Sequence, residues 1–393
     1  MFTIHVGFSG FPYGMASVQR TLLTFKGLQA SGSRAIVINK ISHHQYTDKK
    51  KVKKFEGLLY VNTSLFNSRP SFFLKRNFNK ISGYFGELIF LFKKRKKIDT
   101  AILYSNYFLE YPYYFLLSRI FGFKLVVQYV EMFSAIPGRS SFFTKINDRF
   151  IDNYVGWFCD GVIAISDYLL LHIKKISPKK PVLKIPVMAD FTKINAIAIP
   201  ASKPYIMYCG TIYYFEVIVF IMSVFTLLKE NKKYEGQLLL IISGDHDTNR
   251  QKFDSLIKDS KFKDDIVIKS NIAHDELLAA YAAADVLLIP LRNTIQDIAR
   301  FPHKIGEYTA SRRPILSTNI GEIKTCFKDN VSALLADDYS IEAYYNKLVS
   351  CFNSYAKMDE IGQAGYCVGL NHFEYITQGK EIRNFIDRLG MSA

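Results

Sequence analysis

The sequence predicts an α/β protein with two domains, each built on a parallel β-sheet. Three observations lead to this prediction. The 393 residues exceed what a single hydrophobic core usually serves. Short apolar runs alternate along the chain with segments of helical periodicity, which is typical of α/β folds. A hydrophobic fraction of 49% and a charged fraction of 22% are those of a folded globular protein, so disorder and fibrous repeats are excluded as the main architecture.

The first domain, residues 1–190, begins with elements in the order that opens a parallel α/β sheet. These are a buried strand at 2–8, a glycine-containing loop, a helix from about Ser17 and a strand at 35–40. Further strands and helices follow in alternation, the strands at 100–105, 123–131, 160–166 and 181–187 and the helices at 113–122 and 167–175.

The second domain, residues 203–372, repeats this alternation after a proline-containing stretch at 199–204. Five strands and four helices are predicted there, at 204–210, 216–230, 237–244, 249–259, 265–270, 275–283, 285–290, 303–312 and 314–318, and further helices are predicted beyond 340. Residues 373–393 are predicted to form a C-terminal helix.

Three features predict a cytoplasmic protein that does not span a membrane. The first 15 residues lack the basic leader and long apolar run of a secretory signal. The longest apolar run, 217–228, has 12 residues, whereas a bilayer span needs about 20, so it is interpreted as a buried helix or strand. The five cysteines are scattered without metal-binding spacing, which is typical of free thiols in a reducing compartment.

The net charge of +16 is confined to the first half of the chain. Residues 1–200 contain 29 Lys and Arg against 11 Asp and Glu, whereas residues 201–393 contain 22 against 24. An asymmetry of this kind indicates that the first domain faces an anionic surface. The plain alternative is a solvated basic face.

The basic-aromatic segment, residues 49–97, carries most of this charge. It contains KKKVKK at 49–54, and residues 69–97 hold nine Lys and Arg, one Glu and seven aromatics. Dense apolar clusters such as YFGELIFLF favour insertion below lipid headgroups over binding of nucleic acid, for which no motif is present. The alternative is a helix packed inside the domain with a cationic end. The predicted membrane-docking residues are Lys75, Arg76, Lys93, Lys94, Arg95, Lys96 and Lys97.

Several motifs follow one another in a characteristic order. The second half contains YCGT at 208–211, ADVLLIP at 284–290, FPHKIGEY at 301–308 and RPILST at 313–318, and the first half contains GFPYGMASVQR at 10–20. This ordered set resembles the family-4 glycosyltransferases of the GT-B fold. The resemblance spans nearly the whole chain and is weakest over residues 40–100. It implies two Rossmann-like domains that face a central cleft, with the C-terminal helix packing back on the first domain.

The resemblance implies a nucleotide-sugar donor site in the second domain. A helix that begins near His303 leaves backbone amides for a diphosphate, and Glu307, one turn later, accepts hydrogen bonds from ribose hydroxyls. The alternative for Glu307 is a glutamate that only stabilises its helix. Gly14 would let the opening loop approach the phosphates. The other predicted donor-binding residues are Gly210, Thr211, Ile272, Phe301, His303, Lys304 and Ile305.

Two departures from the family pattern concern catalysis. Ala299 stands where the family often has a sugar-contacting glutamate, and Glu216 lies near the position of an expected lysine. Arg300 and Lys304 are predicted to supply the missing positive charge at the leaving diphosphate. Glu131, with Tyr129 nearby, is predicted on the acceptor side at the end of a first-domain strand.

The implied reaction is retaining transfer that needs neither a metal nor a cofactor. Electrostatic stabilisation of the departing phosphate replaces a protein nucleophile. The triplet Asp245-His246-Asp247 is interpreted as part of a strand-to-helix loop instead of a metal site.

The leading hypothesis is therefore an enzyme of polysaccharide or glycolipid assembly. It would associate peripherally with the inner face of the cytoplasmic membrane and bind a nucleotide-sugar donor, a glycan or lipid-linked acceptor and anionic lipid, but no nucleic acid. One alternative is a catalytically degenerate homologue that serves as a binding or scaffold subunit. Another is a soluble GT-B enzyme such as a sugar-nucleotide epimerase, which has no need of the basic-aromatic segment.

Overall fold

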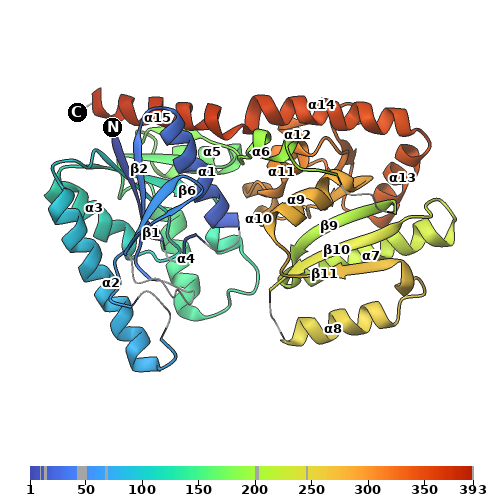
Figure 1. Ribbon diagram of the computed structural model, residues 1–393, viewed down its shortest axis with the longest axis horizontal. Coiled ribbons are helices and arrows are strands. Elements are labelled where there is room, and N and C mark those ends of the chain that lie inside the picture. Colours follow the sequence, from blue (N-terminus) through green and yellow to red (C-terminus); the bar gives the residue numbers. More distant parts are fainter. Residues whose placement is uncertain are drawn as a thin grey trace. The chain divides into compact units, whose positions relative to one another are not determined.

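The computed structural model describes residues 1–8, 10–12, 16–41, 51–66, 70–199, 203–244 and 247–391 (Figure 1). The chain divides into two compact α/β units, each described here by itself. Unit 1 comprises Met1–Met188, Ala299–His303 and Tyr375–Ala393, and unit 2 comprises Ala189–Ile298 and Lys304–Glu374.

Unit 1 is built on an eight-stranded sheet of order β3-β4-β2-β1-β5-β6-β7-β8. All neighbouring strands pair in parallel except β3 and β4, which form an antiparallel hairpin at the edge of the sheet. The hairpin turns at Glu56 and Gly57, both with positive φ, as a tight two-residue hairpin requires. The strands are β1 (Phe2–Phe8), β2 (Arg34–Asn39), β3 (Val52–Phe55), β4 (Leu58–Asn62), β5 (Thr100–Leu103), β6 (Lys124–Tyr129), β7 (Gly161–Ala164) and β8 (Val182–Lys184).

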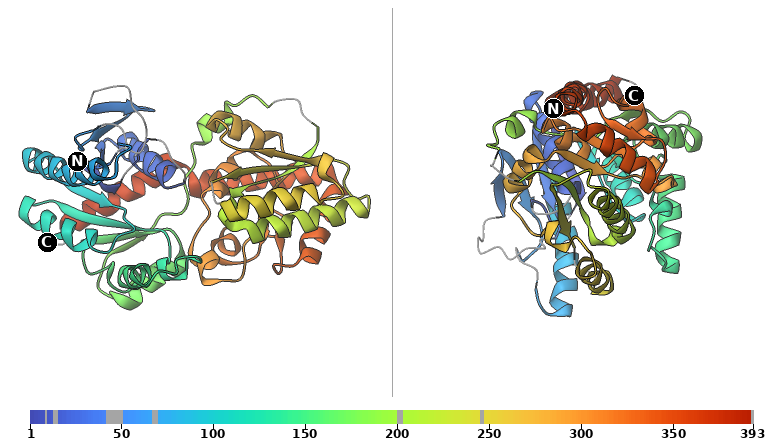
Figure 2. Two further views of the ribbon diagram at one scale, coloured as in Figure 1. Left: turned by 90° about the horizontal axis from the view of Figure 1, so that it is seen from below. Right: turned by 90° about the vertical axis from the view of Figure 1, so that its right-hand side faces the viewer.

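Helices cover both faces of this sheet (Figure 2). Helix α15 packs against α1 at Gly27 and Gly379, where a Cβ added to Gly27 would lie 2.9 Å from the Cα of Gly379. The prediction that the C-terminal helix packs back on the first domain is thereby confirmed. The helices of unit 1 are α1 (Ala16–Ala30), α2 (Phe73–Lys94), α3 (Glu110–Phe121), the short η1 (Phe133–Ala135), α4 (Phe142–Tyr154), α5 (Asp167–Ile176) and α15 (Tyr375–Met391).

Unit 2 is built on a six-stranded parallel sheet of order β11-β10-β9-β12-β13-β14. The strand order reverses between β9 and β12, which makes the carboxyl ends of these two strands a topological switch point. The strands are β9 (Tyr205–Thr211), β10 (Gln237–Ser243), β11 (Ile266–Lys269), β12 (Val286–Ile289), β13 (Ile315–Thr318) and β14 (Leu334–Ala336). The helices are α6 (Phe191–Asn195), η2 (Ile212–Tyr214), α7 (Phe215–Glu230), α8 (Asp247–Lys258), η3 (Lys263–Asp265), α9 (His274–Ala283), α10 (Ile295–Ala299), α11 (Lys304–Ala310), α12 (Gly321–Cys326), α13 (Ile341–Phe352) and α14 (Tyr355–Phe373).

Helix α7 contains the longest apolar run of the chain. With the turn before it, Ile212–Glu230 is long and apolar enough to cross a membrane, with a mean hydropathy of 1.8. Half of that stretch is buried, and Ile218, Ile221 and Phe225 lie in the hydrophobic core of unit 2 with strands β9 and β10. Helix α7 is therefore the core helix of this unit, which explains its composition without a bilayer.

The division into units differs from the predicted boundaries in two places. Unit 2 begins at Ala189, whose backbone N–H donates to the carbonyl of Phe373 over 2.9 Å, so the boundary precedes the proline-containing stretch. The chain also returns to unit 1 at residues 299–303, where the hydroxyl of Ser166 donates to the carbonyl of Ala299. The predicted second domain runs without a break from 203 to 372, whereas these five residues group with unit 1.

Candidate functional site

The switch point of unit 2 is shaped by a close turn after β9. A Cβ on Gly210 would lie 2.4 Å from the hydroxyl oxygen of Tyr208, so a larger residue here would have to displace the tyrosine ring. The hydroxyl of Thr211 is buried and has no hydrogen-bond partner among the described residues. Ser243 at the end of β10 donates to the carbonyl of Gly210 over 3.2 Å. Gly210 and Thr211, both predicted donor-binding residues, therefore lie at the carboxyl edge, where parallel sheets bind ligands.

Glu307 lies in the first turn of α11 and is held by a histidine from another helix. Nε2 of His274, the first residue of α9, donates to Oε1 of Glu307 over 2.9 Å. Their side chains are 33% and 18% exposed, so the pair is accessible to a ligand. The hydrogen bond to Glu307 raises the pKa of His274 above its usual value, against the opposing effect of burial. The imidazole therefore tends to carry a proton beside the carboxylate.

Two buried tyrosines fix the relative position of α9 and α11. The rings of Tyr281 and Tyr308 meet edge to face, with centroids 4.8 Å apart and planes at 72°. Tyr308 directly follows Glu307, and Tyr281 lies two helical turns after His274. Aromatic pairs of this geometry contribute about 0.5–1.5 kcal/mol beyond their area burial. The packing of the two helices thus holds the Glu307–His274 pair together.

The predicted anion site lies at the start of α11, a helix of seven residues. Ile305 is fully buried. Lys304 is half-buried at the start of the same helix. Ile272 is half-buried in the loop that joins β11 to α9, also on the carboxyl edge.

Arg292 was not among the predicted site residues, yet it lies at the switch point. It follows β12, and both its backbone N–H and its Nε donate to Oδ2 of Asp297, over 2.9 and 2.8 Å. Its Nη2 donates to Gln296 over 3.1 Å, and the guanidinium lies 5.6 Å from the ring centroid of Tyr214 in η2. The carboxylate of Asp297 is 1% exposed. The sequence signal that could have indicated this cation is an arginine three residues after the buried strand β12.

Three predicted donor-side residues belong to unit 1 and not to unit 2. Arg300, Phe301 and His303 lie in the stretch that returns to the first sheet. Phe301 is buried, while Arg300 and His303 are half-buried. Their predicted placement in the second domain is corrected accordingly. Gly14 lies outside the described residues.

On the acceptor side, the structure separates Glu131 from Tyr129. Tyr129 is fully buried and its hydroxyl donates to Oδ1 of Asp152 over 2.8 Å, so its predicted exposure toward an acceptor is wrong. Glu131 is half-buried beyond the end of β6. Burial, and then the charge of Glu131, raise the pKa of Tyr104 to about 12. Tyr104 follows β5, so these two side chains interact across adjacent strand ends of unit 1.

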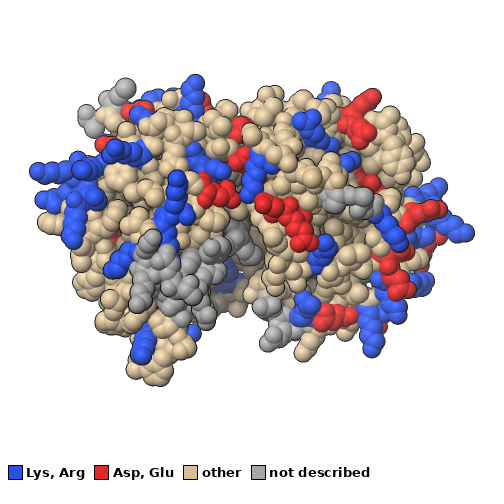
Figure 3. Space-filling model, viewed as in Figure 1, with Lys and Arg blue, Asp and Glu red and all other residues tan. Residues whose placement is uncertain are grey.

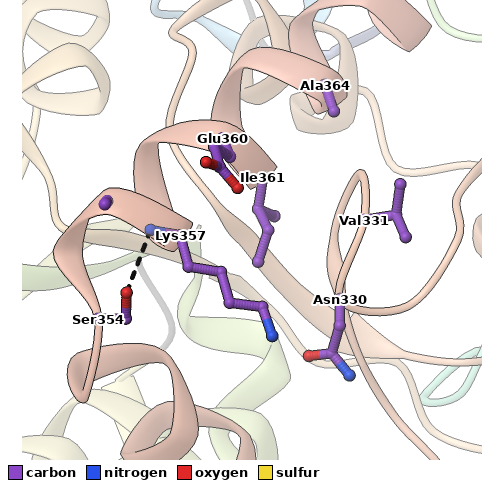
Figure 4. Close-up of a pocket in the computed structure, with 8 residues that line it drawn as sticks. Asn330, Val331, Ser354, Lys357, Glu360, Ile361 and Ala364 are labelled. Atoms are coloured by element: carbon purple, nitrogen blue, oxygen red, sulfur yellow. Dashed lines mark hydrogen bonds between the residues drawn. The ribbon is translucent and has the colours of Figure 1, made fainter.

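The described residues of unit 2 form no second candidate centre. Asp245 and His246 lie outside the described residues, and elsewhere in the described chain no group of three His, Cys, Asp or Glu side chains is placed to hold a metal ion. A hollow of about 530 Å³ is lined by α14 residues such as Lys357 and Glu360 and by Asn330 and Val331 (Figure 4). The loop 328–333 precedes β14, so this hollow lies at the amino edge of the sheet, opposite to the switch point.

Helix α2, within the basic-aromatic segment, buries its small and polar face and exposes its apolar face, the reverse of an ordinary surface helix. Its buried face carries Asn79, Gly83 and Glu87, and a Cβ on Gly83 would lie 2.2 Å from the carbonyl oxygen of Lys40. The exposed apolar residues of α2 recur every three or four positions, which places them on one side of the helix. We call this set the α2 stripe, whose members are each 53–65% exposed: Leu74, Phe78, Ile81, Phe85, Ile89 and Phe92.

The single acid of α2 is turned inward. Oε2 of Glu87 accepts a hydrogen bond from the hydroxyl of Tyr114 over 2.8 Å, and burial raises the pKa of Glu87 to about 7. Neighbouring Glu110 is buried too and pairs with Lys40. Every solvent-facing charge on α2 is therefore basic. Figure 3 shows basic side chains gathered at the left edge of unit 1, in the region of α2 and α3. The predicted docking residues Lys75, Lys93, Lys94, Lys96 and Lys97 are exposed, and Arg76 and Arg95 are partly exposed.

Comparison with solved structures finds the same fold over the whole chain. Sucrose-phosphate synthase from Thermosynechococcus elongatus matches with a TM-score of 0.75 at 15% identity, covering 100% of this chain and 99% of that chain. Anabaena HepE in complex with UDP-glucose matches with a TM-score of 0.72 at 14% identity, covering 99% and 100%. WaaG, a glycosyltransferase involved in lipopolysaccharide biosynthesis, matches with a TM-score of 0.64 at 12% identity, covering 98% and 99%. No curated protein sequence matches the chain.

These two parallel-sheet units, with the last helix returned to the first, define a protein of the GT-B fold class. Residues 190–367 match the family Glycosyl transferases group 1, a stretch that falls almost entirely within unit 2. This stretch of 178 of the 393 residues is therefore similar to that family.

Proposed function

We propose that this protein is a glycosyltransferase that binds a nucleoside diphosphate sugar in unit 2 and transfers the sugar, with retention, to a glycan or lipid-linked acceptor. The reaction would occur at the inner face of the cytoplasmic membrane, in polysaccharide or glycolipid assembly. The observation that carries the donor half is the Glu307–His274 pair at the carboxyl edge of unit 2. The observation that carries the membrane half is the α2 stripe.

Glu307 is suited to the ribose of a donor. His274 occupies one carboxylate oxygen, which orients the group and leaves the other oxygen for a pair of neighbouring hydroxyls. The structural relative HepE is described in complex with UDP and with UDP-glucose, which supports a nucleotide-sugar donor and makes uridine nucleotides the first ones to test.

Retaining transfer at this site needs stabilisation of negative charge on the departing diphosphate. The bond from the sugar to the diphosphate breaks, a bond to the acceptor oxygen forms on the same face, and the acceptor proton passes to a diphosphate oxygen. Lys304 and the fixed Arg292 are the cations that unit 2 offers for this charge, and Arg300 is the predicted contribution of unit 1. Glu131 and Tyr104, at neighbouring strand ends of unit 1, are assigned to the acceptor hydroxyl.

The α2 stripe favours a lipid surface over the two alternatives considered for the basic-aromatic segment. A packed interior helix would bury its apolar side, whereas α2 buries its small and polar side instead. A merely solvated basic face has no reason to expose six large apolar side chains in one row. A helix with such a row and basic flanks lies in the interface plane of a bilayer, where each Lys or Arg contributes about 1 kcal/mol with anionic lipid.

The donor proposal is tested by thermal unfolding with a panel of nucleotide sugars and nucleotides. Only a ligand that binds the native state raises the melting temperature. The rise grows with the ratio of the ligand concentration to its Kd. We expect one nucleoside diphosphate sugar and the corresponding nucleoside diphosphate to stabilise the protein, and Glu307→Gln to weaken this stabilisation strongly. Stabilisation of wild type and variant alike would place the donor elsewhere.

The degenerate-homologue alternative is favoured by two residues. Ala299 is fully buried and offers no carboxylate to a sugar, and Glu216 places an exposed negative charge in the first turn of α7. Under this alternative the protein binds a donor but releases no nucleoside diphosphate from it, whether a lipid extract or a glycan is offered as acceptor. Release of diphosphate that depends on Lys304 excludes it.

A further inference from the structure

Helix α4 carries a second row of exposed apolar side chains, outside the basic-aromatic segment. Phe142 and Phe143 are 71% and 81% exposed, and Ile146 and Phe150 follow at intervals of three or four residues. Trp157, just after the helix, is 59% exposed and is the one tryptophan of the chain. We call these five residues the α4 apolar face.

The exposed charged side chains of α4 are all basic, as they are on α2. Both of its acids are buried and engaged: Asp148 accepts from Nε of Arg139 over 2.6 Å, and Asp152 accepts from Tyr129. The charged side chains that α4 exposes are Lys145 and Arg149. The surface of this helix is therefore apolar and basic, which complements an anionic lipid surface.

The two rows belong to one layer of helices. Helices α2, α3 and α4 join β4 to β5, β5 to β6 and β6 to β7, so each connection crosses the sheet in the same direction. Right-handed crossovers then place all three helices on the same face of the sheet. Ring contacts link them. The ring centroids of Phe92 in α2 and Phe121 in α3 are 6.4 Å apart, and the ring of Phe150 in α4 stacks on that of Phe108, just before α3, with centroids 5.1 Å apart.

The layer is continuous and open. Leu116 and Ile120 on α3, between the two rows, are also well exposed. Figure 1 shows α2 and α4 directed toward the same side of unit 1.

Resting on the proposed membrane function, we propose that the α4 apolar face is a second lipid-inserting element, so that unit 1 docks on anionic lipid with the whole α2–α3–α4 layer. Two separated apolar rows fix the orientation of a docked domain, whereas a single helix leaves it free to roll about its axis. Trp157 would then lie at headgroup level, where amphipathic aromatic rings concentrate.

The native tryptophan makes the test direct. Full-length protein is mixed with vesicles of phosphatidylcholine alone or with phosphatidylglycerol, and binding is measured by flotation. Trp157 emission is recorded with and without lipids brominated on their acyl chains. We expect a shift to shorter wavelength and quenching, with anionic vesicles only.

The variant Phe142→Ser with Phe143→Ser removes the two most exposed rings without touching the core. We expect its vesicle partition coefficient to fall about 10-fold or more, because two apolar side chains no longer leave water. Tyr355→Ser, an exposed aromatic of unit 2, is the matched control and should bind as wild type does. Melting temperature with the stabilising nucleotide checks that each variant remains folded.

The outcomes separate this inference from the proposed function. Flotation with unchanged Trp157 emission and unaltered binding of the Phe142/Phe143 variant would overturn the α4 element and leave docking by α2 intact. Absence of flotation with every vesicle would overturn both. A concentration-dependent Trp157 shift without lipid, together with a doubled mass in light scattering, would mean that a second copy covers this face.

Discussion

Nε2 of His274 lies 2.9 Å from Oε1 of Glu307, which joins the first residue of α9 to the first turn of α11. The two residues are 33 positions apart in sequence and meet because Tyr281 and Tyr308 pack their helices together. The carboxylate expected to bind ribose is thus oriented before any donor arrives, which is the condition for a strong and selective hydrogen bond.

Glu307→Gln should weaken donor binding without unfolding the protein. Each charge-assisted hydrogen bond lost should cost roughly 1.5–3 kcal/mol, which is a 10-fold or greater rise in Kd. Calorimetric titration with the stabilising nucleotide measures this. Glu342→Gln, an exposed glutamate in the first turn of α13, is the control and should bind normally. Equal affinity of Glu307→Gln and wild type would make Glu307 purely structural.

The His274–Glu307 pair should stabilise the fold more at acidic pH. The folded pKa of His274 is raised above its usual value, so its contribution is complete below the unfolded pKa of about 6.5 and is lost as pH rises through the folded pKa. Since the pair is partly exposed, we expect less than about 1 kcal/mol. Urea unfolding of wild type and His274→Gln at pH 5.5 and 8.5 measures it. A difference that grows toward pH 8.5 contradicts the assignment.

Sugar transfer should persist in EDTA. The charge of the diphosphate is assigned to cationic side chains and backbone amides, so removal of divalent cations leaves the machinery in place. Initial rates in EDTA and in Mn²⁺ should agree within about twofold, with an enzyme of known metal dependence as the control. Reversible loss on chelation, restored by Mn²⁺, would require a metal site.

Charge reversal of the five residues 93–97 should release the protein from anionic vesicles. At about 1 kcal/mol for each basic residue near the surface, the change turns the attraction of the end of α2 and the three residues after it into repulsion, and raised salt should also weaken binding. Transfer to a soluble, short-chain acceptor should be unaffected. Reversal of five exposed lysines of unit 2 is the matched control: Lys233, Lys252, Lys258, Lys261 and Lys263. If both variants float equally with wild type, the cluster has another role.

Gly86→Ala should destabilise the protein because α2 touches the sheet backbone there. A Cβ at Gly86 would lie 2.0 Å from the carbonyl oxygen of Thr63, so either the helix or the strand end must move. Overpacking of this kind costs about 1–3 kcal/mol, measured as a lower urea midpoint. Gly390→Ala in α15, where a Cβ meets nothing within 4 Å, should be neutral or slightly stabilising. Equal midpoints for the two variants would show that α2 tolerates displacement.

Much of the architecture is determined by the sequence alone, because buried parallel strands are continuous apolar runs that can be identified locally. Strands such as β1, β6 and β10 and the core helix α7 fall where the apolar runs predict them. The motif FPHKIGEY places Glu307 in the first turn of α11 for the same reason, since it depends on neighbouring residues only.

Only the tertiary structure determined the contacts between residues that are distant in sequence. No local pattern indicates that His274 would hold Glu307, that Asp297 would fix Arg292, or that Tyr129 would turn inward to Asp152. The return of residues 299–303 to unit 1 likewise depends on packing against Ser166. Helix α2 shows the physical reason most clearly. Periodicity reveals two faces of a helix, but which face is buried is decided by what packs against it, and here the close approach of Gly83 and Gly86 to the sheet leaves the aromatic face outside.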